Sequence, residues 1–173
     1  SNMQFQLKKA RDAEKEIAAA DFPQIRLFQI PARVKRTPQT DVEGRWQACS
    51  PKSVPKFSAV AYFFGRELHH RLKVPIGLVH GSQGWTPGEA WMSREALLAV
   101  PELKYIVKRW DDVTKIGDEY AAKQKAWVKA GKPKGKQPKR PKENAMFIHR
   151  ASGLYNGCIH PLAPMAMRGV IWY

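Results

Sequence analysis

The chain opens with Ser1-Asn2-Met3, and a serine in such a turn is the first residue whose type suits covalent chemistry. A serine hydroxyl becomes a nucleophile when a neighbouring base takes its proton, and it can then attack an ester carbonyl. Alternatively, the first residues are a remnant of a cloning vector in front of a domain. Both interpretations stay open on these three residues alone.

A second candidate is the loop HGSQGW at residues 80–85, which follows the short apolar run PIGLV. Its two glycines leave backbone N–H groups accessible, and such groups bind an anion or the oxyanion of an acyl-transfer reaction. The next four residues, Thr86-Pro87-Gly88-Glu89, combine a capping residue, a proline suited to the first helical position and a Thr-x-x-Glu capping box. We therefore expect a helix to begin directly after the loop. Glycine loops of this kind are common, so the loop alone does not specify an enzyme.

The other reactive side chains form no recognisable centre. Cys49 and Cys158 are too few for a disulfide framework or a zinc site, and they could be two free thiols or one bridge. No acidic pair and no metal-ligand spacing stands out, so we expect neither a metal nor a cofactor. Surface, loop or core positions are expected for four of the histidines: His69, His70, His80 and His149.

The elements that must position these residues alternate between strands and helices, which predicts an α/β layered fold. Predicted helices cover residues 12–20, 58–72 and 102–129, and predicted strands cover 25–30, 75–79 and 169–173, with a polar connection over 37–55. Ligands of open α/β sheets bind beyond the carboxyl ends of the strands. The loop at 80–85 and the turn at Ser1 are therefore expected to meet there.

Composition indicates a single folded domain with a basic surface. The 173 residues are 43% hydrophobic, and 30 Lys and Arg against 15 Asp and Glu give a net charge of +15. Nine basic residues and no acid fall between residues 123 and 142, among prolines and glycines, which predicts an exposed irregular loop. That loop is either a plain basic insertion, at about residues 123–148, or a surface that binds polyanions. We expect no membrane span and find no signal peptide in the sequence.

Five separated blocks of the sequence, in order, resemble the sialate O-acetylesterase family of the SGNH-hydrolase group of serine esterases. SNM with Leu7 matches the second half of the family's nucleophile turn GQSNM, and QGWTPGEAW at residues 83–91 matches WGGTPAEAW. LYNG, IHPL and GVIWY also match, and the family continues the last block into QGE-x-N. The resemblance covers nearly the whole chain and favours the nucleophile turn over the vector remnant at Ser1.

The resemblance implies an SGNH-like (flavodoxin-like) three-layer fold, a parallel sheet with helices on both faces, incomplete over residues 1–173. It also implies that Ser1 is the nucleophile, that the Gly84 backbone N–H belongs to the oxyanion hole, and that Gln83 and Asn156 bind substrate. Trp85 stands where the family has its second loop glycine, a departure that affects the shape of the pocket. His160, in IHPL, is considered as a substitute base, although it belongs to a different block.

The family's side-chain amide donor and its Asp-x-x-His pair would follow Tyr173. The implied function is hydrolysis of sugar O-acetyl esters by a Ser-His-Asp mechanism, with the chain as given expected to be inactive. The alternative is a non-catalytic fragment, or a module that binds polyanions or glycans through the basic loop. Expected partners are an O-acetylated sugar or polysaccharide and, through that loop, a polyanion. A secreted or periplasmic location is expected from the resemblance alone.

Overall fold

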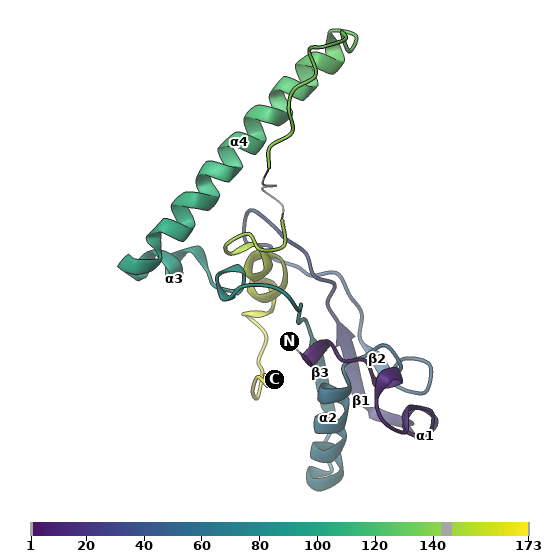
Figure 1. The fold of residues 1–173 in the computed structure, drawn as a ribbon. Helices are drawn as coiled ribbons and strands as arrows, with labels where there is room; N and C mark the ends of the chain where they lie inside the picture. The colour runs from purple at the N-terminus through teal and green to yellow at the C-terminus, as the bar shows by residue number, and fades with distance from the viewer. Residues whose placement is uncertain (1, 143–146, 173) are drawn as a thin grey trace. The chain divides into compact units, whose positions relative to one another are not determined.

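The computed structural model describes residues 2–142 and 147–172 (Figure 1). Within these residues the chain forms two compact units, which are described separately. The first unit takes the chain up to Ala32, then Gln39–Thr86 and the part from Cys158 onward. The second unit consists of Arg33–Pro38 and Pro87–Gly157. The prediction of one partial esterase domain over residues 1–173 stays a prediction.

A three-stranded sheet organises the first unit, in the order β2-β1-β3. Strand β1 (Phe22–Gln29) pairs in parallel with β3 (Ile76–His80) and antiparallel with the short β2 (Gln47–Cys49). The strands expected near residues 25–30 and 75–79 are confirmed, whereas β2 lies inside the expected connection at 37–55. Because β1 and β3 are parallel, both end at the same edge of the sheet, with Gln29 opposite His80.

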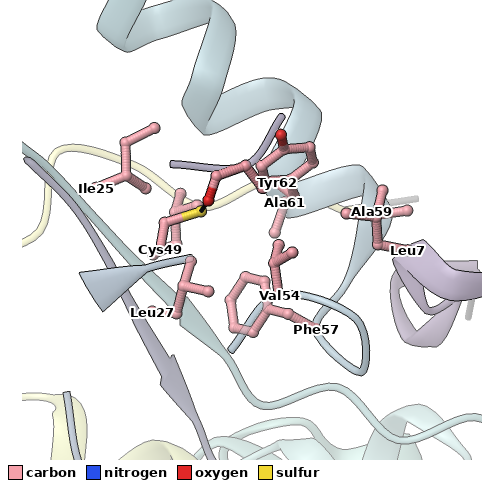
Figure 2. Packing of buried hydrophobic residues seen from close by; sticks show 11 residues of the cluster. Leu7, Ile25, Leu27, Cys49, Val54, Phe57, Ala59, Ala61 and Tyr62 are labelled. Atoms are coloured by element: carbon pink, nitrogen blue, oxygen red, sulfur yellow. Dashed lines mark hydrogen bonds between the residues drawn. The ribbon is translucent and has the colours of Figure 1, made fainter. Parts of the chain in front are cut away.

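Helix α2 (Ala59–Leu72) packs against this sheet and confirms the helix expected at 58–72. The Ser58 hydroxyl begins it by accepting a hydrogen bond of 3.1 Å from the Ala61 N–H. Gly65 allows the close approach, since a Cβ there would lie 2.6 Å from the Leu78 side chain. Figure 2 shows the resulting core, in which Tyr62 is fully buried.

The N-terminal segment is fixed to the start of α2 by backbone hydrogen bonds. It comprises the 3₁₀ turns η1 (Asn2–Gln4) and η2 (Leu7–Lys9) and the short helix α1 (Ala13–Ala18). The Leu7 N–H donates to the Phe57 carbonyl at 3.0 Å, and the Ala59 N–H donates to the Phe5 carbonyl at 2.7 Å. With Leu7 completely buried, these bonds hold η1 beside the sheet core.

The second unit is mainly helical. It contains the 3₁₀ turn η3 (Gly88–Trp91), helix α3 (Arg94–Ala99), the turn η4 (Pro101–Leu103) and the long helix α4 (Lys104–Lys129). Leu97 of α3 packs with Val107 and Trp110 of α4 in its core. The π-helical turn η5 (Tyr155–Ile159) and the 3₁₀ turn η6 (His160–Leu162) follow later in the sequence.

The strand expected at residues 169–173 is wrong over its described part. Residues 169–172 form no strand, and the side chains of Val170 and Trp172 are 83% and 75% exposed. A buried parallel strand needs a hydrogen-bonding neighbour and cover on both faces. An apolar run predicts such a strand only where those neighbours are present, and here these residues have neither.

Two other local expectations are wrong. Thr86 does not cap a helix: its hydroxyl donates to the Gln83 carbonyl at 2.7 Å, and only the four-residue turn η3 follows. The side-chain cap lies further on, where Ser93 accepts from the Ala96 N–H at 3.0 Å and begins α3. The basic segment, expected to be irregular from residue 123, is helical up to Lys129, where α4 confirms the helix expected at 102–129, and is irregular only beyond that point.

The structure confirms the α/β class. Its sheet is small and mixed, and helices accompany it. Among the described residues no helix combines the length and the apolar character that a membrane span requires. Cys49 and Cys158 are free thiols, and both are buried.

Candidate active site

The carboxyl ends of β1 and β3 carry two polar side chains that bind each other. Gln29 Nε2 donates to the His80 carbonyl at 3.1 Å, so Gln29 Oε1 remains for the His80 ring, 2.7 Å from Nδ1. Nδ1–H is therefore the donor to Gln29 Oε1. On the other side of the ring, Nε2 lies 2.7 Å from Ser82 Oγ.

The surroundings of His80 favour its neutral form. The side chain is only 7% exposed, and the Phe57 ring packs edge-on against it with ring centroids 5.7 Å apart. Burial lowers the pKa of His80 below its ordinary value, and a hydrogen bond with the Met3 backbone partly opposes this shift. His80 thus links the sheet, the turn next to Ser1 and the loop at residues 80–85.

The loop is held from its other side by Gln4, the last residue of η1. The Gly84 N–H donates to Gln4 Oε1 at 2.7 Å. Gln4 Nε2 in turn lies 3.2 Å from Gln83 Oε1 and 3.3 Å from the Ser82 carbonyl. The backbone N–H expected in the oxyanion hole is therefore bound to an oxygen from a residue three positions after Ser1.

Ser1 itself lies outside the described residues, so its role stays a prediction. The structure does bring Gly84 and Gln83 together with the η1 turn that follows Ser1. Gln83 also donates from Nε2 to the Gly84 carbonyl at 3.4 Å. Its amide contributes to the internal order of the loop, and its part in substrate binding stays a prediction.

The remaining predicted residues bind backbone carbonyls. Asn156, in the second unit, is 6% exposed and donates from Nδ2 to the Lys35 carbonyl at 3.2 Å. His160, in the first unit, binds the Gln39 carbonyl through Nδ1 at 2.9 Å. Neither role proposed from the sequence, in substrate binding or as a substitute base, is tested by these contacts.

The departure from the family pattern at Trp85 has a structural counterpart. Trp85 has a left-handed backbone, with φ of 60°, and its side chain is 97% exposed. A bulky residue in that region is uncommon, whereas glycine adopts it without steric cost. A glycine at this position would adopt the observed conformation without that cost.

Sequence reasoning missed the contributions of Gln4, Gln29 and the His80–Ser82 pair. A polar residue at the carboxyl end of each parallel strand was a usable signal for Gln29 and His80, since strand ends carry ligand groups in α/β sheets. Gln4 gave no such signal, because its contacts with residues 82–84 depend on tertiary structure. In residues 2–142 and 147–172, no cluster of three His, Cys, Asp or Glu is placed to hold a metal ion.

Comparison with known proteins identifies relatives of this chain. No family model matches the chain. The chain is similar over its whole length to the sialate O-acetylesterases of rat (Rattus norvegicus, 29% identity over 190 residues, 33% of that protein) and mouse (Mus musculus, 30% over 186 residues, 32%). It is also similar to a solved structure, a carbohydrate acetylesterase from Xanthomonas citri, with 29% identity and a TM-score of 0.67. That match covers all of this chain and 30% of the other.

The chain spans about a third of the length of these relatives. Within that third, the full-length match to enzymes of one name and the shared fold point the same way as the five sequence blocks. The chain is therefore similar to the sialate O-acetylesterases over the third of their length that it spans.

Proposed function

We propose that this protein takes part in hydrolysing O-acetyl esters of sugars, with Ser1 as the nucleophile. The observation that carries the proposal is the Gly84 N–H, which Gln4 binds from the turn η1 that follows Ser1 in the sequence. A backbone N–H in this place can stabilise the oxyanion that forms when a serine attacks an ester carbonyl. The names of the relatives support an acetylated carbohydrate as the substrate.

In the proposed mechanism Ser1 Oγ attacks the acetyl carbonyl, and a histidine accepts the serine proton. The tetrahedral oxyanion binds the Gly84 N–H, and collapse releases the sugar alcohol, which takes its proton from the same histidine. Water then hydrolyses the acetyl-enzyme to acetate by the reverse sequence of proton transfers. We place the histidine, its aspartate and an asparagine donor in the Asp-x-x-His and QGE-x-N blocks expected beyond Tyr173.

His80 does not take the role of this base in the proposal. Its Nδ1–H is bound to an amide oxygen, which stabilises an imidazolium less than a carboxylate does, and burial already opposes protonation. Its Nε2 is occupied by Ser82 Oγ. We therefore assign His80 to the support of the loop.

The test is hydrolysis of p-nitrophenyl acetate and of an O-acetylated sugar by three proteins. They are the 173-residue chain, a chain extended through the expected Asp-x-x-His block, and the extended chain with Ser1→Ala. We expect turnover by the extended chain only, and its loss on Ser1→Ala by a factor of at least about 10³. Efficient turnover by the Ser1→Ala protein would exclude Ser1 as the nucleophile.

A second role, polyanion binding, is proposed for the basic segment because its charges are all exposed. The nine Lys and Arg side chains between residues 123 and 142 are open to solvent, which suits attraction of acidic glycans. Such attraction would concentrate an acidic polysaccharide near the enzyme without taking part in the reaction. A secreted or periplasmic location, where such polysaccharides occur, is proposed with it.

A further inference from the structure

The Gln4 side chain makes hydrogen bonds to three successive residues of the loop. Its Oε1 accepts from the Gly84 N–H at 2.7 Å, and its Nε2 lies within 3.3 Å of the Ser82 carbonyl and of Gln83 Oε1. The amide is thus oriented so that a neutral carbonyl oxygen occupies the Gly84 donor. An ester carbonyl presents the same kind of oxygen to an oxyanion hole.

The two sides of the loop are held differently. On the sheet side, the buried His80 binds Ser82 Oγ and is itself fixed by Gln29. On the other side, Gln4 is exposed to solvent. The loop therefore keeps its support from the sheet when the Gln4 amide moves away, because an exposed side chain can change rotamer without disturbing the core.

We propose that Gln4 is a positioning residue that stands in for the acyl oxygen at the Gly84 N–H, and that the substrate oxygen replaces it during the reaction. This inference rests on the proposed function. The Gly84 N–H has one proton, so a substrate oxygen that takes a full hydrogen bond must displace Gln4 Oε1. No bond is made or broken covalently in this exchange, and Gln4 transfers no proton.

The exchange favours the transition state over the bound ester. A neutral ester carbonyl and the neutral Gln4 amide compete for the N–H on similar terms, so the ester gains little from the donor. An oxyanion makes a charge-assisted bond of about twice the strength and displaces Gln4 readily. Only interactions that are stronger in the transition state accelerate the chemical step. Gln4 would thus weaken the hydrogen bond between the Gly84 N–H and the ester, while the oxyanion still binds this N–H.

The test compares three variants in the chain extended through the Asp-x-x-His block. Gln4→Met keeps the length of the side chain and removes the competing oxygen, so kcat/KM should rise roughly two- to tenfold, the value of one ordinary hydrogen bond. Gln4→Glu places a negative charge at the same N–H and opposes the oxyanion, so kcat/KM should fall about tenfold or more. Gln24→Met makes the first change at an exposed position of β1 and should leave kcat/KM at the wild-type value.

A second readout does not depend on turnover. In the 173-residue chain, hydrogen exchange of the Gly84 amide followed by NMR should be several-fold faster in Gln4→Met than in the wild type. A loss of activity in both Gln4 variants would overturn the exchange and leave Gln4 as a purely structural clamp. Unchanged amide exchange would show that the bond itself is absent. If the extended wild-type chain is inactive, the exchange and the proposed function are both overturned. If it is active but Gln4→Met does not raise kcat/KM, the exchange alone is overturned.

Discussion

His80 and Gln29 end two neighbouring parallel strands and are joined by two hydrogen bonds. One runs from Gln29 Nε2 to the His80 carbonyl at 3.1 Å, and the other joins Gln29 Oε1 to His80 Nδ1 at 2.7 Å. The first bond fixes the orientation of the amide, and the second therefore fixes the tautomer of the ring. The loop that contains Gly84 begins from this fixed point.

This relationship predicts a pH dependence of stability. The pKa of His80 is lowered in the folded chain, so below its ordinary value near 6.5 the unfolded chain binds more protons than the folded one. His80 then contributes a loss of stability that starts as pH falls below about 6.5 and levels off below the lowered pKa. Because a single proton is involved, its slope stays below about 1.4 kcal/mol per pH unit. Above about pH 7.5 this contribution is absent.

Urea unfolding at pH 7.5 and at pH 5.0 measures the effect. His80→Gln should lose less stability on acidification than the wild type, because a glutamine at this position cannot be protonated. Gln24→Met, a change at an exposed position of β1 that alters no titratable group, should lose as much stability on acidification as the wild type. Equal acid sensitivity of His80→Gln and the wild type would contradict a lowered pKa at His80.

The two thiols should be slow to react in the folded chain. Burial, helped by the carboxylate of Asp21 and opposed by Arg66, raises the pKa of Cys49 to about 11, so the thiolate is a small fraction at pH 8. Cys158 is buried as well. Titration with an aromatic disulfide reagent should be slow under native conditions and should reach two thiols per chain in urea. Fewer than two in urea without reductant would indicate a bridge.

The sequence predicted the elements whose patterns are local. The period of residues 58–72 and the alternation over 25–30 were sufficient for α2 and β1, because an amphipathic helix and a half-buried strand show their buried faces in the sequence. The run GVIWY failed because burial of a strand depends on neighbours elsewhere in the chain. The Thr86 hydroxyl failed as a cap for a related reason: it donates to the Gln83 carbonyl, a contact that depends on the conformation of the loop before it.

The candidate site was only partly predictable for the same reason. The glycine loop was found from its position after a strand, and Ser1 from a resemblance, since a lone serine has no local signature. The contact between Gln4 and Gly84 joins residues 80 positions apart, and the residues between them must fold before it exists. For the basic segment the sequence supported two overlapping predictions, a helix over 102–129 and an irregular loop from residue 123, and the helix holds up to Lys129, because lysine also has a high helix propensity.

The glycine of the LYNG block should resist substitution. A Cβ at Gly157 would collide with the carbonyl oxygen of Arg33, a backbone atom that cannot rotate away. Gly157→Ala should therefore destabilise the chain by about 1–3 kcal/mol, the range of overpacking in a core. Gly88→Ala is the matched control, because nothing lies within 4 Å of its added Cβ. Equal shifts of the urea midpoint in both variants would show that residues 33–38 move to accommodate the added methyl group without loss of stability.

The basic segment should bind polyanions without supporting the fold. Lysines 132, 134, 136 and 139 are exposed beyond the end of α4. Replacing all four by Gln should weaken retention on heparin. The free energy of unfolding should stay within about 0.5 kcal/mol of the wild-type value. The control removes the same charge from the first unit, at lysines 8, 9, 52 and 56, which are also exposed. Equal loss of retention in both variants would mean that net charge, and not this segment, determines binding.

The left-handed backbone at Trp85 predicts a difference between two small residues. An L-residue in this conformation costs about 1–2 kcal/mol because its Cβ approaches the following carbonyl oxygen, and glycine has no Cβ. Trp85 is 97% exposed, so either substitution removes little packing. Glycine also makes the unfolded chain more flexible, which reduces the free energy of unfolding by about 0.5–1 kcal/mol relative to alanine. Trp85→Gly should therefore be more stable than Trp85→Ala by up to about 1.5 kcal/mol in urea unfolding. Alanine equal to or better than glycine would mean that the loop leaves the left-handed region when tryptophan is removed, and that the conformation belongs to the tryptophan and not to the family's loop.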